Sequence, residues 1–189
     1  MKELLQKLQS FQPYNEQEAR DKEVLIKQIQ TQPDVFLRSN KTNHISASAW
    51  VVNPQRTKVL MAYHNIYDSW SWLGGHADGD VDLLSVALRE VREESGVKEV
   101  KPVREEIFSV EVLTVDGHEK HGKYVSSHLH LNVTYLLEVS EWEKLHIKED
   151  ENSKVAWFGL EEAIQASTES WFRERIYGKL NEKLIRYGW

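Results

Sequence analysis

The stretch GHADGDVDLLSVALREVREESGV (residues 75–97) constrains the fold more than any other part of the chain. Its apolar residues follow the i, i+3, i+4, i+7 spacing of one helix face, at Leu84, Ala87, Leu88 and Val91. An aspartate before this run and Gly96 after it are typical of a helix start and a helix end. The sequence therefore predicts a helix over residues 81–95 with one buried side.

Three glutamates, Glu90, Glu93 and Glu94, gather at the end of this predicted helix. At about 100° per residue, Glu90 and Glu94 flank the apolar stripe, and Glu93 lies further round. Clustered carboxylates repel one another, and a half-sheltered set of hard oxygen ligands suits Mg²⁺ or Mn²⁺. The same spacing is typical of a solvated helix face with i, i+4 ion pairs, such as Arg89 with Glu93. The residues alone leave both interpretations open.

The stretch resembles the Nudix box of the Nudix hydrolase family. In that box a glycine is followed at fixed spacing by a glutamate and then by Arg-Glu-apolar-any-Glu-Glu-any-Gly-apolar. The positions that match are Gly75, Arg89, Glu90, Val91, Glu93, Glu94, Gly96 and Val97. Two positions depart, because Val81 stands where the box has its first glutamate and Leu73 replaces the usual proline. With its flanking strands, the resemblance covers roughly residues 44–165.

The resemblance implies an α/β fold, namely a Nudix-type α/β/α sandwich with a mixed β-sheet. It also implies a hydrolase that cleaves a diphosphate linkage in a nucleotide or another phosphorylated small molecule. Glu90, Glu93 and Glu94 are then expected to ligate Mg²⁺ or Mn²⁺, helped by the backbone carbonyl of Gly75. Arg89 is expected to orient Glu93 as a supporting residue.

A glutamate from a later loop often adds a metal ligand or serves as the general base in this family. Residues 149–151 offer three carboxylates, and we favour Glu151 because it comes just before the predicted strand KVAWF. A solvated acidic turn is the competing interpretation. Val81 supports an alternative function, a catalytically weak Nudix-fold module that binds nucleotides or regulates. The related isoprenoid diphosphate isomerases use a cysteine, and this chain has none.

The rest of the pattern indicates a mixed α/β domain at residues 41–189. Alternating or β-rich runs predict strands at residues 44–52, 57–63, 105–115, 127–139 and 154–160. Helices are predicted at residues 160–166 and 170–185. Residues 1–40 form a polar helical extension, in which Asn15 and Glu18 read as a capping box. We expect this extension to pack on the domain or on a second subunit of a homodimer.

A polar loop is predicted between two strands, at residues 116–127. We expect its residues Lys120, Lys123 and Tyr124 to contact the phosphates or the leaving group of the substrate. His76 follows the ligand glycine directly, and we expect it to enter the same site. The competing interpretations are a solvated loop and a plain turn residue.

Four histidines are close in sequence, at His118, His121, His128 and His130. His128 and His130 alternate on a predicted strand, so both point to one face. A zinc site is one interpretation of this cluster, although no carboxylate partner stands at a fixed spacing. A loop that covers the active site is the interpretation we favour.

Composition limits the remaining classes of protein. The chain has 189 residues, a net charge of −6 and no cysteine, which excludes disulfides, thiolate zinc sites and cysteine nucleophiles. It shows no basic block, no long apolar run and no signal-peptide core. We therefore expect a cytoplasmic protein with no membrane span and no dedicated nucleic-acid surface. The resemblance to Nudix hydrolases implies a small-molecule diphosphate substrate.

Overall fold

A computed structural model describes residues 1–120 and 122–188 of the chain. The side chain of Lys120 lies outside the described part. The strands are β1 (Asn43–Val52), β2 (Lys58–His64), β3 (Ser69–Ser71), β4 (Leu73–His76), β5 (Val100–Pro102), β6 (Ser109–Val115), β7 (His118–Lys120), β8 (Lys123–Val125), β9 (His128–Val139) and β10 (Asn152–Gly159). The helices are α1 (Lys2–Ser10), α2 (Glu16–Thr31), α3 (Leu83–Ser95), α4 (Leu160–Ala166), the π-helical turn η1 (Phe172–Tyr177) and α5 (Gly178–Tyr187).

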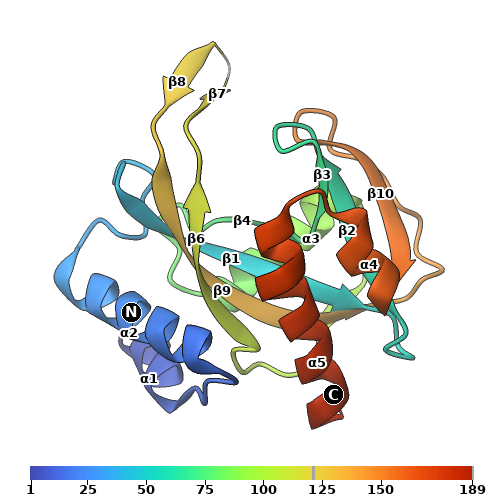
Figure 1. The fold of residues 1–189 in the computed structure, drawn as a ribbon, viewed down its shortest axis with the longest axis horizontal. Coiled ribbons are helices and arrows are strands. Elements are labelled where there is room, and N and C mark those ends of the chain that lie inside the picture. The colour runs from blue at the N-terminus through green and yellow to red at the C-terminus, as the bar shows by residue number, and fades with distance from the viewer. Residues whose placement is uncertain (121, 189) are drawn as a thin grey trace.

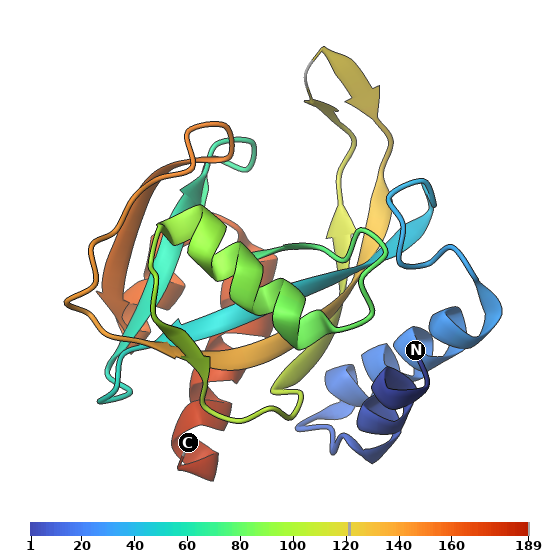
Figure 2. The same cartoon turned by 180° about the vertical axis from the view of Figure 1, so that it is seen from behind.

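The main sheet is mixed and curled. Its central path runs β10-β2-β1-β9-β5, and β3, β4 and β6 pair with β2, β1 and β9 respectively. The long β1–β9 pair is parallel, whereas the other pairs are antiparallel. Figure 1 shows α4 and α5 over one face of this sheet, and Figure 2 shows α3 across the opposite face. The arrangement confirms the predicted α/β/α sandwich.

Alternation along β1 explains why both faces of the sheet are covered. Ala47 and Ala49 join the apolar core under α3, and Trp50 and Val52 join a second core under α5. The whole of β1 is buried, as expected for a central strand with helices on both sides. No helix in the described residues is both long enough and apolar enough to cross a membrane.

The N-terminal extension packs on its own domain. The buried apolar side chains of α1 and α2 belong to the same core as α3, and they are Leu4, Leu8, Leu25 and Ile29. Helix α2 begins where predicted, because the Asn15 side chain accepts a hydrogen bond from the Glu18 N–H at 2.9 Å. In Figure 1 the pair α1 and α2 lies beside β6 at one side of the sheet.

The segment predicted as a polar loop at residues 116–127 is a hairpin instead. Strands β7 and β8 pair antiparallel and project beyond the sheet as a continuation of β6 and β9 (Figure 1). The turn contains Gly122 at φ +71°, a conformation that favours glycine. His121, which the sequence placed in a histidine cluster, lies outside the described residues.

Candidate active site

A cleft of about 910 Å³ opens where α3, β4, the β7–β8 hairpin and the loop before β10 meet. All three predicted metal-ligating glutamates, Glu90, Glu93 and Glu94, line it. The two predicted partners Gly75 and Arg89 line it as well. The structure therefore brings the matching positions of the box together at one end of the sheet.

The three carboxylates differ in their exposure. Glu94 is 7% exposed and accepts a hydrogen bond from the Gly74 N–H at 3.0 Å. Burial raises the pKa of Glu94 well above its ordinary value, although the Gly74 N–H opposes this shift. Burial, followed by the charge of Glu93, raises the pKa of Glu90. Glu93 lies further round the helix, as its position in the sequence predicts, with its side chain about half exposed.

The two glycines of β4 let the strand lie directly against its neighbours. A Cβ atom on Gly75 would stand 2.6 Å from Oε2 of Glu90. A Cβ atom on Gly74 would stand 2.6 Å from the backbone of Ser48 on β1. The contact with the β1 backbone requires glycine at position 74, whereas a side chain at position 75 would displace the Glu90 carboxylate. The result is a backbone strand packed against the carboxylates.

Two cations hold the acidic groups. Arg89 approaches Glu90 at 3.4 Å, Glu93 at 3.9 Å and Asp80 at 3.8 Å. Its contact with Glu90 is thus closer than the predicted contact with Glu93. Lys148 bridges Glu93 at 3.2 Å and Glu151 at 3.0 Å.

The bridging position of Lys148 affects its protonation. Partial burial acts to lower the pKa of Lys148, but its hydrogen bonds and charge interactions with Glu151 and Glu93 raise that pKa above the ordinary value. The ammonium therefore stays charged and joins α3 to the loop before β10. The residues of α3 alone do not make this connection, because Lys148 belongs to the loop before β10.

Val81 is 43% exposed and stands in the turn before α3. Asp82 serves as the helix N-cap and accepts a hydrogen bond from the Ser85 N–H at 3.2 Å. Asp80 lines the cleft and faces Arg89. Of the two carboxylates that flank Val81, Asp80 is therefore the one that lines the cleft. It lies next to the position where the box has its first glutamate.

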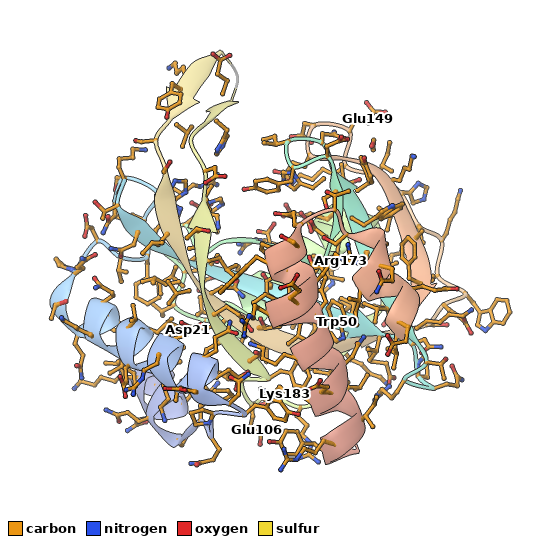
Figure 3. The ribbon with its side chains drawn as sticks, in the orientation of Figure 1. Asp21, Trp50, Glu106, Glu149, Arg173 and Lys183 are labelled. Atoms are coloured by element: carbon orange, nitrogen blue, oxygen red, sulfur yellow. The ribbon has the colours of Figure 1, made fainter. Side chains whose placement is uncertain are left out.

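The loop before β10 brings Asp150 and Glu151 to the cleft. Glu149 is exposed, lies outside the cleft lining and stands at the outer end of the loop (Figure 3). Glu151 lies next to Lys148 and within electrostatic reach of Glu94.

The predicted substrate contacts divide into two groups. His76 and Tyr124 line the cleft. Lys123 is exposed and lies outside the lining, and the Lys120 side chain lies outside the described part of the chain. The sequence missed Arg38 and Lys41, which come from the loop before β1 and line the cleft. No local motif marks them, because the fold alone carries that loop to the site.

Aromatic side chains form another part of the cleft wall. Trp72 lines the cleft with Phe172, and their ring centroids are 6.0 Å apart in an edge-to-face arrangement. Trp70 packs instead against Phe158, with centroids 4.8 Å apart. Trp72, unlike Trp70, is therefore placed where it can touch a ligand.

The donor set fits a hard divalent cation. Carboxylates from Glu90, Glu93 and Glu94 line the same cleft, and burial together with neighbouring negative charge raises the pKa values of Glu90 and Glu94. A divalent cation would neutralise that charge, and oxygen ligands of this kind suit Mg²⁺ or Mn²⁺.

Comparison with known proteins agrees with this fold. The sequence model of the NUDIX domain matches residues 42–180. The crystal structure of a C. elegans Ap4A hydrolase binary complex is 17% identical to this chain with a TM-score of 0.52, over 76% of this chain and 96% of that chain. The E. coli dihydroneopterin triphosphate pyrophosphohydrolase is 16% identical with a TM-score of 0.53, over 71% of this chain and 92% of that chain.

A NUDIX family hydrolase from Clostridium perfringens is 19% identical with a TM-score of 0.52, over 76% of this chain and 97% of that chain. Comparison of the sequence with curated proteins gives no match. At these identities the solved structures show the shared fold. The sequence model, in contrast, spans most of the chain and includes every cleft carboxylate on α3. The chain therefore belongs to the NUDIX domain family.

Proposed function

We propose that this protein is a hydrolase that cleaves a diphosphate linkage in a nucleotide or another phosphorylated small molecule, with Mg²⁺ or Mn²⁺ as cofactor. The observation that carries the proposal is that Glu90, Glu93 and Glu94 all line one cleft of about 910 Å³, beside the β4 glycines. The similar structures named Ap4A hydrolase and dihydroneopterin triphosphate pyrophosphohydrolase support the same class of substrate.

In this proposal, Glu90, Glu93 and Glu94 hold the divalent cation together with the backbone carbonyl of Gly75. The cation, when bound, neutralises phosphate oxygens and lowers the pKa of a bound water. Arg89 keeps the carboxylates of Glu90 and Glu93 in place through its two ion pairs. A change at Arg89 therefore acts through the glutamates, because the guanidinium does not need to touch the substrate.

Glu151 is the proposed general base. It accepts a proton from a water whose oxygen attacks one phosphorus atom of the diphosphate. The bond from that phosphorus to the bridging oxygen breaks, and the bridging oxygen leaves with the other phosphate. Lys148 supports this role, because its ion pairs place Glu151 next to Glu93.

Other residues that line the cleft are proposed to bind the substrate. Arg38 and Lys41 offer positive charge to outer phosphates, and His76 and Tyr124 offer polar contacts. The Arg38 side chain is already fixed by Asp78, with its Nε donating to Oδ1 at 2.6 Å. Trp72 provides an apolar ring on which a flat group of the substrate can stack.

The test is a screen of dinucleoside polyphosphates, nucleoside triphosphates and nucleoside diphosphate sugars with Mg²⁺ and Mn²⁺. Chromatography identifies the two products of each cleavage. We expect Glu151→Gln to lower kcat by about 100-fold or more. The matched variant Glu149→Gln, in the same loop but outside the cleft, should retain wild-type rates.

Binding without turnover of every compound in the screen would overturn the hydrolase proposal. That result would favour the nucleotide-binding module that Val81 suggests. Equal losses in Glu151→Gln and Glu149→Gln would instead remove Glu151 from the role of base. Isothermal titration with the same compounds separates these outcomes, because it measures binding independently of hydrolysis.

A further inference from the structure

Four histidines meet at the hairpin end of the cleft, from three different strands. The parallel register sets His44 of β1 directly opposite His130 of β9. The antiparallel register sets His76 of β4 opposite Ser46, two residues after His44 and on the same face. His128 is two residues before His130, so its side chain lies on this face as well. Sheet pairing, not sequence proximity, assembles the group.

The ring nitrogens converge at short distances. Nε2 of His130 is 3.2 Å from Nε2 of His76 and 3.2 Å from Nε2 of His128. The ligand atoms of His44, His76 and His130 all lie within 4.8 Å of one another. Two nitrogens bound to one tetrahedral Zn²⁺ at about 2.0–2.1 Å stand about 3.3 Å apart. The observed spacing therefore matches one edge of a metal-binding tetrahedron.

Hydrogen bonds fix the tautomers of two of these rings. Nδ1 of His44 lies 3.0 Å from the Asn40 carbonyl oxygen, and Nδ1 of His128 lies 2.8 Å from the Ser126 carbonyl oxygen. A carbonyl accepts only, so each Nδ1 carries the proton and each Nε2 presents a lone pair. A backbone carbonyl on the far nitrogen is also the usual support of a metal-ligating histidine.

His44 provides a second observation, independent of the nitrogen spacing, that points to a bound ligand. It is only 5% exposed, and its Nε2 has no hydrogen-bond partner in the described structure. A buried acceptor left without a partner costs free energy, so such atoms are rare. A cation placed among the converging nitrogens satisfies Nε2 of His44.

We propose that His44, His76 and His130 form a second metal site, which takes a transition-metal cation of the Zn²⁺ type, with His128 beside the open position. Imidazole nitrogen suits Zn²⁺ and related ions, whereas carboxylate oxygen suits Mg²⁺ and Mn²⁺. The site is thus chemically distinct from Glu90, Glu93 and Glu94, although His76 directly follows Gly75. An anion is the less suitable ligand, because binding it needs protons on nitrogens that are 3.2 Å apart.

The first test uses the wild-type protein and Zn²⁺ alone. Histidine ring nitrogens are followed by ¹⁵N NMR as Zn²⁺ is added in the presence of excess Mg²⁺. We expect the Nε2 signals of His44, His76 and His130 to shift at one equivalent of Zn²⁺, with His146 unchanged. His146 is exposed and lies outside the cleft, which makes it an internal reference. Unshifted cluster signals would overturn the proposal.

The second test compares variants by competition titration with a Zn²⁺ chelator. His130→Gln should raise the Kd for Zn²⁺ at least about 10-fold, and His146→Gln should leave it unchanged. Glu93→Gln should also retain Zn²⁺ binding, since it changes only the carboxylate site. Loss of Zn²⁺ binding in Glu93→Gln but not in His130→Gln would place Zn²⁺ on the carboxylates and refute the histidine site. Either result is independent of whether the protein hydrolyses diphosphates.

Discussion

Replacing Glu18 by Gln tests how the N-terminal extension is held on the domain. Glu18 is fully buried in α2 and contacts two lysines of α5, Lys183 at 2.7 Å and Lys179 at 3.4 Å. Lys179 also pairs with the buried Glu111 of β6 at 2.9 Å. The Ser109 hydroxyl donates to Glu18 at 2.6 Å. The two carboxylates and two ammonium groups thus form a neutral set inside the protein, where α2, β6 and α5 meet.

The expected loss of stability in Glu18→Gln follows from this balance of buried charges. Glu18→Gln keeps the size of the side chain but leaves one buried positive charge without compensation. Breaking one partner of a buried ion pair costs about 3–5 kcal/mol. For a chain of this length, 1 kcal/mol corresponds to roughly 2–4 °C in Tm, so Tm should fall by roughly 6–20 °C. Glu23→Gln, on an exposed part of the same helix, should cost less than about 0.5 kcal/mol.

Urea unfolding followed by circular dichroism measures both variants, together with Lys183→Met and the double variant Glu18→Gln/Lys183→Met. The double variant restores neutrality, so it should be more stable than the sum of the single losses by about 1–3 kcal/mol. A loss below about 1 kcal/mol in Glu18→Gln, or strictly additive losses, would refute the argument that charge balance holds the extension.

The same set of charges gives a pH dependence. Burial lowers the pKa of Lys183 more than Glu18 raises it, so the folded pKa lies below the ordinary 10.5. The unfolded chain therefore binds more protons in the interval between the two values, and this group makes the free energy of unfolding rise with pH there. Glu18→Gln removes the opposing charge and lowers the folded pKa further. The deficit of the variant should therefore shrink as pH approaches 10.5.

Three further predictions concern the cleft. Mn²⁺ should raise the Tm of the wild-type protein in differential scanning fluorimetry, and Glu93→Gln should remove most of this shift while Glu99→Gln retains it. Val81→Glu should lower the Kd for Mg²⁺ by adding a carboxylate at the rim, and an unchanged Kd would mean that Asp80 already serves. Arg38→Ala should lower kcat/KM for the best substrate about fivefold, and a larger effect in Lys123→Ala would place the phosphates at the hairpin instead.

Local patterns explain which parts of the fold were predictable. Helix α3 was predicted because its apolar stripe, its N-cap and Gly96 lie within one stretch of sequence. Strand β4 was missed because two of its four residues, Gly74 and Gly75, have low strand propensity. They are tolerated because β4 must approach β1 and α3 closely. The hairpin β7–β8 was read as a loop because it is polar and gains its order from continuing β6 and β9.

The candidate site also contains residues that local sequence patterns could predict and residues that they could not. The carboxylates on α3 were predictable, since helical periodicity alone places them together. Arg38 and His44 were not, because Arg38 comes from the loop before β1 and His44 reaches the cleft through the parallel pairing of β1 with β9. Parallel pairing joins segments far apart in sequence and leaves no short-range pattern. His130 was noticed, but its partners His44 and His76 belong to strands that a sequence cluster cannot include.

One layer of buried polar side chains connects the N-terminal extension to the cleft. Asn132 accepts hydrogen bonds from Ser46 and Ser48, and it donates to Glu111 at 3.0 Å. Glu111 is the partner of Lys179, which also contacts Glu18 of the extension. Ser48 in turn lies against Gly74, so this chain of contacts ends at the strand that packs on the cleft carboxylates. Residues 1–41 lie outside the NUDIX match, yet Glu18 satisfies buried charges of the layer that positions β4. The extension therefore supports the floor of the cleft as well as the apolar core.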